Sequence, residues 1–440
     1  MFVNVGRSFA KYVSLNILGM ITASALVFID AIFISIAMGA DGLAAVSLTG
    51  PIFGIVFGVG LLVGEGGGSK YAANMASGKE EKANAFFTSA IRTCFIISIP
   101  LIIIGVFFSE PFSMLLGARG NIVPMVAEYI SVLLTASPII ILYYALESFV
   151  RNDGTPGIAT VSSVVLYIFN ILLDYIFIIQ MNLGMFGSGL ATVVAAVFSC
   201  GYLIYHWNKK ARFHLVQVFA GFKKTKSLLA IGAPSFVLNV IGGINALVFN
   251  WAFLYHLGNV GVAAFGIVAT LSVLVFAVFF GIAQGMQPMA SHFFGAGDKE
   301  GLKKVLNYAL ATSFGVAVLC IASVFIFTNE LVGIFNNEPN PAIAAELVSH
   351  AVVGARIYFA AFIFVGITTV SIYYLAATGA PKRALILSVL QNAGIIPIVY
   401  IAAFSGGVVA IWASYPGFEM VLAGLSVFWL VKALRKPITL

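Results

Sequence analysis

A small set of oxygen-bearing side chains lies inside long apolar runs of this sequence. Asp30 stands within the first run, and Asp174 stands within the fifth, four residues after Asn170. Thr192 lies near one end of the sixth run. Two carboxylates, an amide carbonyl and a hydroxyl are hard oxygen donors, which suit a small cation or a proton. These residues therefore predict a site for a small cation or a proton.

An acidic side chain within lipid is costly unless it faces a cavity, has a partner or takes up a proton. Asn170 and Asp174 project from one helix face, since residues four apart lie about one turn apart. Hydrogen bonding between packed helices is the alternative role for all four residues. It applies most to Asn170 and Thr192, whose residue types are common between membrane helices.

Polar residues also interrupt apolar runs in the second half of the chain. Gln284 and Gln287 break the eighth run, where they either line a cavity that receives a substrate or accompany a local kink. Arg356 lies within the tenth run and needs an acidic partner or a water-filled cavity. Glu346 and Glu419 are the candidate partners of Arg356.

Three features near the ends of the runs predict local contacts. Glu147 and Arg151 are four residues apart on a predicted helix and are expected to pair. Glu65 and Lys70 are expected to reach the inner headgroup region of a bilayer. The tandem glycines at 64–68 predict a close contact between helices.

The elements that position these side chains follow from composition. The chain has 440 residues, of which 61% are hydrophobic and 9% are charged, and its mean hydropathy is +1.06. Soluble domains are about 25% charged, so this composition excludes a soluble globular protein. A β-barrel is excluded because the apolar runs are continuous and do not alternate along ~10-residue strands.

About twelve apolar stretches have the roughly 20 residues that cross a bilayer as a helix. The polar segments between them are too short to form a soluble domain. The predicted spans are 12–38, 48–75, 85–108, 122–147, 157–180, 187–207, 228–256, 262–294, 305–327, 343–375, 385–404 and 408–431.

The charges between the spans predict their orientation. If the N-terminus is cytoplasmic, almost all Lys and Arg residues fall in inside segments, and the outside segments hold only Arg119. Cytoplasmic loops of membrane proteins carry an excess of such cations. We therefore expect a multi-pass cell-membrane protein with both termini in the cytoplasm and the basic segment 208–227 as a cytoplasmic connector. The net charge of +7 then needs no nucleic acid to explain it.

The sequence contains an internal repeat of about half its length. A shift of 219 residues pairs Gly39 with Gly258 and matches the polar loops ASGKEEK and GAGDKEG, and a shift of 225 pairs Gly154 with Gly379 later in the repeat. The register changes near NNEPNP at 336–341. A repeat of six spans enters the membrane twice from the same side, so the two copies are parallel.

The repeat predicts an all-α polytopic protein whose two parallel six-helix lobes surround a central cavity, as in an alternating-access transporter. The boundaries are 1–207 for the N-terminal lobe, 208–227 for the connector and 228–440 for the C-terminal lobe. The polar set has no counterpart in the second lobe. The mates of Asp30, Asn170, Asp174 and Thr192 are Phe249, Ile395, Val399 and Ile411.

Motifs along nearly the whole chain resemble the multidrug and toxic compound extrusion (MATE) family of the multidrug/oligosaccharide-lipid/polysaccharide exporter superfamily. In the first half they are FIDAIFIS at 28–35, GADGLAAVSLTGP at 39–51, RNDGTPG at 151–157, NILLD at 170–174 and GSGLAT at 187–192. In the second half they are GNVGVAAFGI at 258–267, GIAQGMQPMASHFFGAGDKEG at 281–301 and ATGAPKRA at 377–384. Their order and spacing carry the resemblance.

The resemblance implies a cation site at Asp30, Asn170, Asp174 and Thr192, because family members with a coupling site in the N-terminal lobe use these residue types on the first, fifth and sixth helices. Some of those proteins have a Tyr one turn before the first-helix Asp, where this chain has Leu26. Both Na⁺ and H⁺ therefore stay open as the coupling ion.

The function predicted is a cation-coupled antiporter that exports amphipathic, cationic drugs and toxic organic compounds by alternating access, and that confers antibiotic resistance. A lipid-linked oligosaccharide flippase of the same superfamily and a passive channel are the alternatives. We expect a monomer in the lipid bilayer with small organic substrates, no nucleic-acid partner and no cofactor besides the coupling ion. The sequence has no GxxxxGK[ST] or HExxH motif, so an enzyme is not expected.

Overall fold

The computed structural model of the chain describes residues 4–217, 222–333 and 341–435. Within these ranges the chain is almost entirely helical and has no β-strand. Residues 336–340, where the register of the repeat changes, lie outside the described residues, as do residues 218–221 of the connector. The all-α fold class is confirmed.

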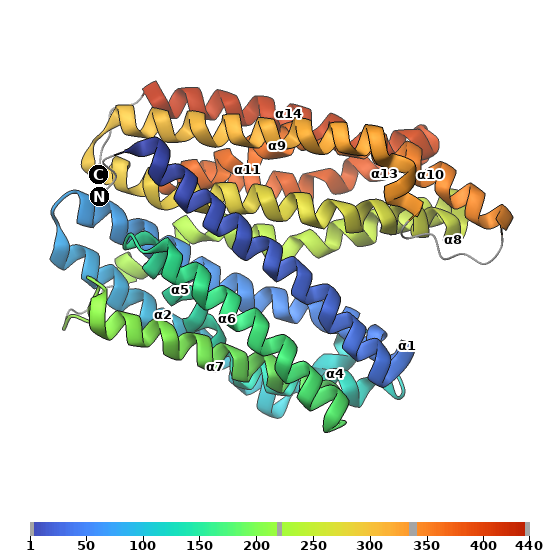
Figure 1. The fold of residues 1–440 in the computed structure, drawn as a ribbon, viewed down its shortest axis with the longest axis horizontal. Coiled ribbons are helices and arrows are strands. Elements are labelled where there is room, and N and C mark those ends of the chain that lie inside the picture. The colour runs from blue at the N-terminus through green and yellow to red at the C-terminus, as the bar shows by residue number, and fades with distance from the viewer. Residues whose placement is uncertain (1–3, 218–221, 334–340, 436–440) are drawn as a thin grey trace.

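The number of predicted spans is also confirmed. Among the described residues, eleven helical segments are long and apolar enough to cross a membrane, with α1 and α8 contributing two segments each. A twelfth span is formed if the bent pair Ile122–Thr135 and Ser137–Asn152, with an angle of 56° between them, counts as one crossing. The helices (Figure 1) are α1 (Val5–Ala76), α2 (Glu80–Phe107), α3 (Ser109–Leu115), α4 (Ile122–Thr135), α5 (Ser137–Asn152), α6 (Pro156–Asp174), η1 (Tyr175–Gln180), α7 (Gly184–Lys210), α8 (Phe222–Ala296), α9 (Lys299–Gly333), α10 (Pro341–Phe359), α11 (Phe362–Ala377), α12 (Pro381–Val389), η2 (Leu390–Gly394), α13 (Ile395–Ser405) and α14 (Gly407–Arg435).

The backbone repeats in the same way as the sequence. Long helices α1 and α8 each contain two spans joined at a glycine, Gly39 with φ 60° and ψ −143° in α1 and Gly258 with φ 61° and ψ −147° in α8. The second register is visible at Gly154 and Gly379, whose φ angles are 100° and 80°. Residues with a side chain are strained at such positive φ values, whereas glycine adopts them freely. The glycine pairs found in the sequence therefore mark equivalent turns of two copies of one unit.

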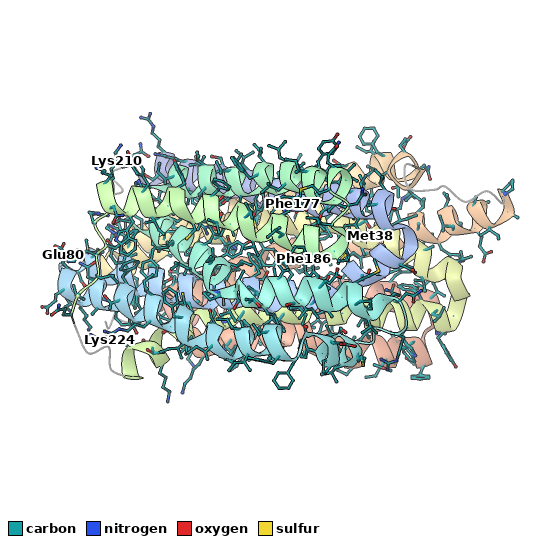
Figure 2. All side chains as sticks on the ribbon, turned by 90° about the horizontal axis from the view of Figure 1, so that it is seen from below. Met38, Glu80, Phe177, Phe186, Lys210 and Lys224 are labelled. Atoms are coloured by element: carbon teal, nitrogen blue, oxygen red, sulfur yellow. The ribbon has the colours of Figure 1, made fainter. Side chains whose placement is uncertain are left out.

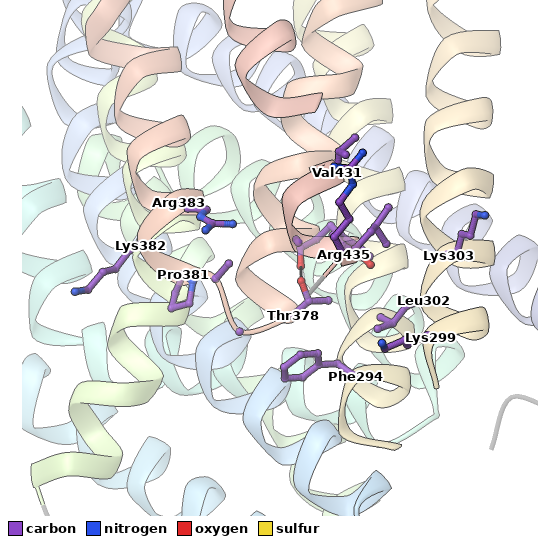
Figure 3. Close-up of a pocket in the computed structure, with 15 residues that line it drawn as sticks. Phe294, Lys299, Leu302, Lys303, Thr378, Pro381, Lys382, Arg383, Val431 and Arg435 are labelled. Atoms are coloured by element: carbon purple, nitrogen blue, oxygen red, sulfur yellow. Dashed lines mark hydrogen bonds between the residues drawn. The ribbon is translucent and has the colours of Figure 1, made fainter. Parts of the chain in front are cut away.

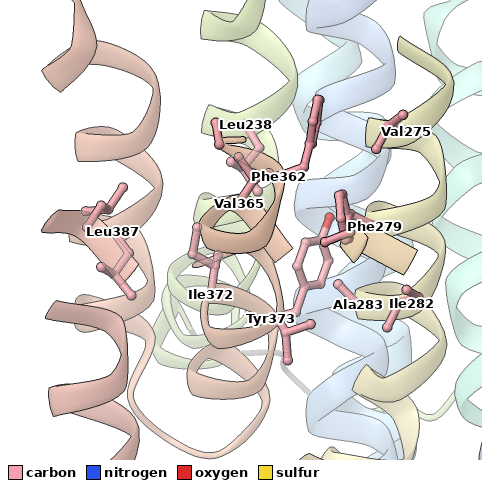
Figure 4. Close-up of a cluster of buried hydrophobic side chains, with 14 of the residues drawn as sticks. Leu238, Val275, Phe279, Ile282, Ala283, Phe362, Val365, Ile372, Tyr373 and Leu387 are labelled. Atoms are coloured by element: carbon pink, nitrogen blue, oxygen red, sulfur yellow. The ribbon is translucent and has the colours of Figure 1, made fainter. Parts of the chain in front are cut away.

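Buried apolar side chains of the described residues form two large clusters and a small third one. The first large cluster draws on residues between Ile34 and Leu228, and the second draws mainly on residues between Ile231 and Leu430. Figure 4 shows part of the second cluster, in which side chains of α8, α11 and α12 interdigitate. We call the helices α1 to α7 the N-lobe and α8 to α14 the C-lobe. The first turns of α1 are an exception to this division, because Phe9 and Val13 pack in the C-lobe cluster.

The charged ends of the helices gather at one end of the molecule. Helix α1 begins at the same end at which α14 finishes (Figure 1). Glu80, Lys210 and Lys224 lie at that end as well (Figure 2). This arrangement agrees with an even number of crossings, because an even number returns the chain to the side from which it started.

Glycines bring the two lobes together near this charged end. A Cβ atom on Gly66 would lie 2.0 Å from the carbonyl oxygen of Leu228, and one on Gly232 would lie 1.8 Å from the carbonyl oxygen of Leu62. Gly285, the repeat mate of Gly66, meets the Cα of Val13 in the same way at 2.8 Å. The backbones approach so closely only because no side chain stands between them. The glycines at 64–68 thus include the close helix contact that the sequence predicts.

Replacing Gly232 by Ala should destabilise the packed lobes. An added methyl group would overlap the Leu62 carbonyl, and such overpacking costs about 1–3 kcal/mol. The measurement is the apparent Tm of the purified protein in detergent, which should fall.

Gly424→Ala is the matched control, because open space surrounds that helical glycine and Ala favours a helix over Gly. Its apparent Tm should stay level or rise. Equal apparent Tm values for the two variants would contradict the close contact.

Candidate cation site

Asp30 and Asp174 face each other inside the N-lobe. They lie on α1 and α6, and the two carboxyl groups are close enough to interact directly. Asp174 is completely buried. No described residue donates a hydrogen bond to either Asp174 oxygen or to Oδ1 of Asp30. Two ionised carboxylates repel each other in a buried site, so this pair requires a cation or a shared proton.

The helix that carries Asp174 changes its geometry at that residue. Helix α6 ends at Asp174, and the chain continues without interruption as the π-helical turn η1 from Tyr175 to Gln180. A π-turn is wider than an α-helical turn and is frequent at functional sites. The backbone next to Asp174 is therefore irregular where a bound ion would lie. The apolar sequence of this segment does not predict the π-turn.

The remaining members of the predicted set lie on the same side of the N-lobe. Asn170 is buried one turn before Asp174, and no described residue accepts a hydrogen bond from its Nδ2 atom. The Thr192 hydroxyl on α7 donates to the carbonyl oxygen of Ser188 at 3.2 Å. The structure thus brings Asp30 and Asp174 together and places Asn170 and Thr192 on the neighbouring helical turns.

Tyr129 is a residue of this site that sequence reasoning missed. It is buried on α4, interacts with the Thr192 side chain and lies within electrostatic reach of Asp30 and Asp174. Its phenol therefore supplies a hydroxyl to a site in which Leu26 stands at the position of the family's Tyr. The sequence has 16 tyrosines, and no sequence feature distinguishes Tyr129 from the others.

A second polar cluster crosses between the lobes. The Arg151 guanidinium donates to Glu147 at 2.6 Å, which confirms that pair, and also to Gln284 Oε1 of the C-lobe at 3.1 Å. Ser163 donates to Glu147 at 3.0 Å. Glu147, Arg151, Ser163 and Gln284 line a cavity of about 40 Å³, which is room for a single water molecule or little more.

Gln287 is buried close by on the same helix as Gln284. No described residue accepts a hydrogen bond from its Nε2 atom. The side chain therefore retains a free donor between the helices.

Glu65 also joins the lobes, so the expectation that it reaches the inner headgroup region is wrong. The side chain is buried on α1 and accepts a hydrogen bond from Ser235 on α8. Gly66, next to Glu65, and Gly232 on α8 allow the two helices to approach so closely that the carboxyl meets the other lobe before it meets lipid. Sequence position alone did not reveal this contact, because it depends on how the two lobes pack.

Arg356 makes its contacts at the outside of the C-lobe. Its Nε donates to Thr328 Oγ1 on α9 at 3.3 Å, and its guanidinium lies 5.9 Å from the centre of the Phe325 ring. Glu419, one of the two candidate partners, instead accepts from Gln391 at 3.2 Å. The described contacts therefore place Arg356 beside α9, away from the small cavity that Gln284 lines.

The chain matches the MatE family model over residues 16–176 and 246–401. Multidrug export protein MepA of Staphylococcus saprophyticus is 29% identical over 364 residues, which are 82% of this chain and 78% of that protein. MepA of Staphylococcus aureus is 29% identical over 377 residues, which are 84% of this chain and 81% of that protein.

A solved structure has the same fold along almost the whole chain. The crystal structure of a MATE protein in complex with MaL6 has a TM-score of 0.91 and 20% identity, and it covers 98% of this chain and 97% of its own. At this identity the likeness shows the fold alone.

The Glu147–Arg151 pair should matter for stability. Replacing Arg151 by Met leaves a buried carboxylate without its cation, and breaking such a pair costs about 3–5 kcal/mol. The apparent Tm in detergent should fall. The double variant Glu147→Gln, Arg151→Met removes both charges and should regain most of the loss. A double variant no more stable than Arg151→Met would contradict the pairing account.

Proposed function

Since the chain belongs to the MatE family of transporters, we propose that it is a secondary antiporter that exports amphipathic organic cations in exchange for Na⁺ or H⁺. Its relatives in two Staphylococcus species bear the name multidrug export protein, which supports drugs and toxic organic compounds as substrates. We place it in the plasma membrane as a monomer with both termini in the cytoplasm, divided into residues 1–207, 208–227 and 228–440. The coupling ion is its only cofactor.

The observation that carries this proposal is the buried carboxyl pair of the N-lobe and its absence from the C-lobe. The repeat mates of Asp30 and Asp174 are Phe249 and Val399, which are buried in the apolar cluster of the C-lobe. The six-helix unit therefore packs without carboxyl groups at these positions. Because an unpaired buried carboxylate destabilises a fold, its presence in one lobe favours a role in binding a cation.

Helix α1 provides the physical link between ion binding and the rest of the transporter. Asp30 lies in the same helical segment (Val5–Gly39) as Phe9 and Val13, which pack in the C-lobe cluster. A cation between Asp30 and Asp174 would draw α1 toward α6 and change its packing against the C-lobe. Ion and substrate are then coupled through their different affinities for the two arrangements, since a ligand that binds both equally shifts nothing.

The contacts between the lobes suggest which state the structure represents. Glu65–Ser235, Arg151–Gln284 and the glycine contacts all join the N-lobe to the C-lobe. The glycine contacts lie near the charged end of the molecule, which we take as cytoplasmic. We interpret the arrangement as closed to the cytoplasm, and these contacts would have to open in the inward-facing state.

The flippase alternative gains no support from the buried charges. A cavity that holds a lipid pyrophosphate needs free cations. The arginine that lines the small cavity between the lobes is already paired with Glu147. A passive channel remains distinguishable by experiment, because it would carry current without exchanging one solute for another.

Replacing Asp30 or Asp174 by Asn should abolish efflux of a fluorescent organic cation from proteoliposomes, because the neutral amide removes the charge that holds the coupling ion. Na⁺ and pH gradients are imposed separately to identify that ion. Asp41→Asn, at an exposed acidic position on the same helix, is the matched control and should export normally. Gradient-driven efflux at the wild-type rate in both site variants would overturn the coupling assignment.

A further inference from the structure

A large pocket lies in the C-lobe, away from the carboxyl pair. It has a volume of about 770 Å³ and lies where α9 and α12 begin and where α11 and α14 end. Five cationic side chains line it, namely Lys299, Lys303, Lys382, Arg383 and Arg435. Figure 3 shows Arg435 between Arg383 and Lys303, with Lys299 beside Leu302.

The pocket carries positive charge that the described residues around it do not neutralise. No Asp or Glu is among the described residues that line it. Of the nearby acids, Glu300 pairs with Lys304 at 3.6 Å, and Asp298 accepts a hydrogen bond from the backbone of Gly301 at 2.9 Å. The positively charged side chains that line the pocket repel one another. An anion in the pocket would relieve the repulsion.

The equivalent region of the N-lobe is occupied by the chain itself. Phe213 of the connector is buried there against Phe149 and Phe87. Arg212 pairs with Asp153 at 2.9 Å. The repeat mates of Phe149 and Asp153 are Tyr374 and Thr378, and both line the C-lobe pocket. The same architectural position is therefore filled and neutralised in one lobe, whereas in the other it is open and cationic.

The backbone at the pocket adds to its preference for an anion. Helix α12 begins at Pro381, and no side chain caps its N-terminus. Pro381 has no N–H, and the N–H groups of Arg383 and Ala384 donate to the Ala380 carbonyl. The contribution of this helix start is therefore the positive end of the helix dipole, which attracts negative groups such as phosphate. The cationic side chains around this helix start act in the same direction.

The rim of the pocket identifies the kind of anion. Val431 and Leu434, on the last turns of α14, line the pocket and also expose about 40% of their surface to the surroundings of the helix bundle. Such side chains suit an acyl chain or a glycerol backbone, whereas a free phosphate ion would gain nothing from them. Basic pockets between membrane helices are also known to hold anionic headgroups.

We propose that the C-lobe pocket binds the phosphate headgroup of an anionic membrane lipid, with Arg383, Arg435 and Lys299 contacting the phosphate and α14 contacting the lipid tail. The site is separate from the Asp30–Asp174 pair and does not depend on the transported substrate. A lipid held there would join the starts of α9 and α12 to the end of α14.

The test measures binding of phosphatidylglycerol, phosphatidylcholine and inorganic phosphate to delipidated full-length protein in detergent, by native mass spectrometry and by thermal shift. The double variant Arg383→Gln, Arg435→Gln removes two lining cations. It should weaken phosphatidylglycerol binding by roughly thirtyfold, given the contribution of each Lys or Arg to anionic lipid binding. The variant Lys304→Gln, Lys432→Gln loses the same charge from the start of α9 and the end of α14, two helix ends that border the pocket, but neither residue lines it. It should bind phosphatidylglycerol like the wild type.

The proposal requires that phosphatidylglycerol binds more tightly than phosphatidylcholine and that millimolar inorganic phosphate does not displace it. Equal loss of binding in the two double variants would show a diffuse charge effect and overturn the site. Displacement by inorganic phosphate would assign the pocket to a soluble anion and overturn the lipid. The single variant Lys299→Gln serves if the double variant fails to fold, and wild-type affinity in that variant would count against the proposal.

Discussion

The structure depends on one electrostatic constraint, the presence of two carboxyl groups that face each other inside a lipid-embedded lobe, with no hydrogen bond from the described residues to either Asp174 oxygen or to Oδ1 of Asp30. Asp30 and Asp174 come from helices on either side of the site, so whatever neutralises them also holds these helices together. A scaffold of this kind does not need such a pair, because the C-lobe packs Phe249 and Val399 at the equivalent positions. Under the proposed function, the pair makes the packing of α1 sensitive to a bound cation, which is the property an antiporter requires.

The repeat explains how that local sensitivity reaches the other lobe. Equivalent breaks at Gly39 and Gly258 divide α1 and α8 in the same way. The first segment of α1 packs against the C-lobe, and the second approaches α8 at Gly66 and Gly232. The two lobes share an architecture but differ in chemistry. The N-lobe contains the carboxyl pair and a pocket filled by the connector, whereas the C-lobe has an apolar core and an open cationic pocket.

Much of this arrangement is predictable from sequence, because lipid restricts a chain to few solutions. Continuous apolar runs predicted the spans, and paired glycines predicted the repeat that the φ angles confirm. The cost of an acid in lipid singled out Asp30 and Asp174, which the fold then placed face to face. Tyr129 and the burial of Glu65 were not predictable, because both depend on contacts between helices distant in sequence. The C-lobe pocket was not predicted for another reason. Its Lys and Arg residues also fit the excess of cations expected in cytoplasmic loops, so they did not indicate a binding site.

The central claim is that a cation at the carboxyl pair and an organic substrate move in opposite directions through one protein. The most direct test loads proteoliposomes with the organic cation alone and follows radioactive Na⁺ and internal pH as it leaves. Thermodynamic coupling is reciprocal, so the substrate gradient should drive uptake of Na⁺ or H⁺ in the wild-type protein and not in Asp174→Asn. Substrate efflux that proceeds with no inward movement of either ion would contradict the account.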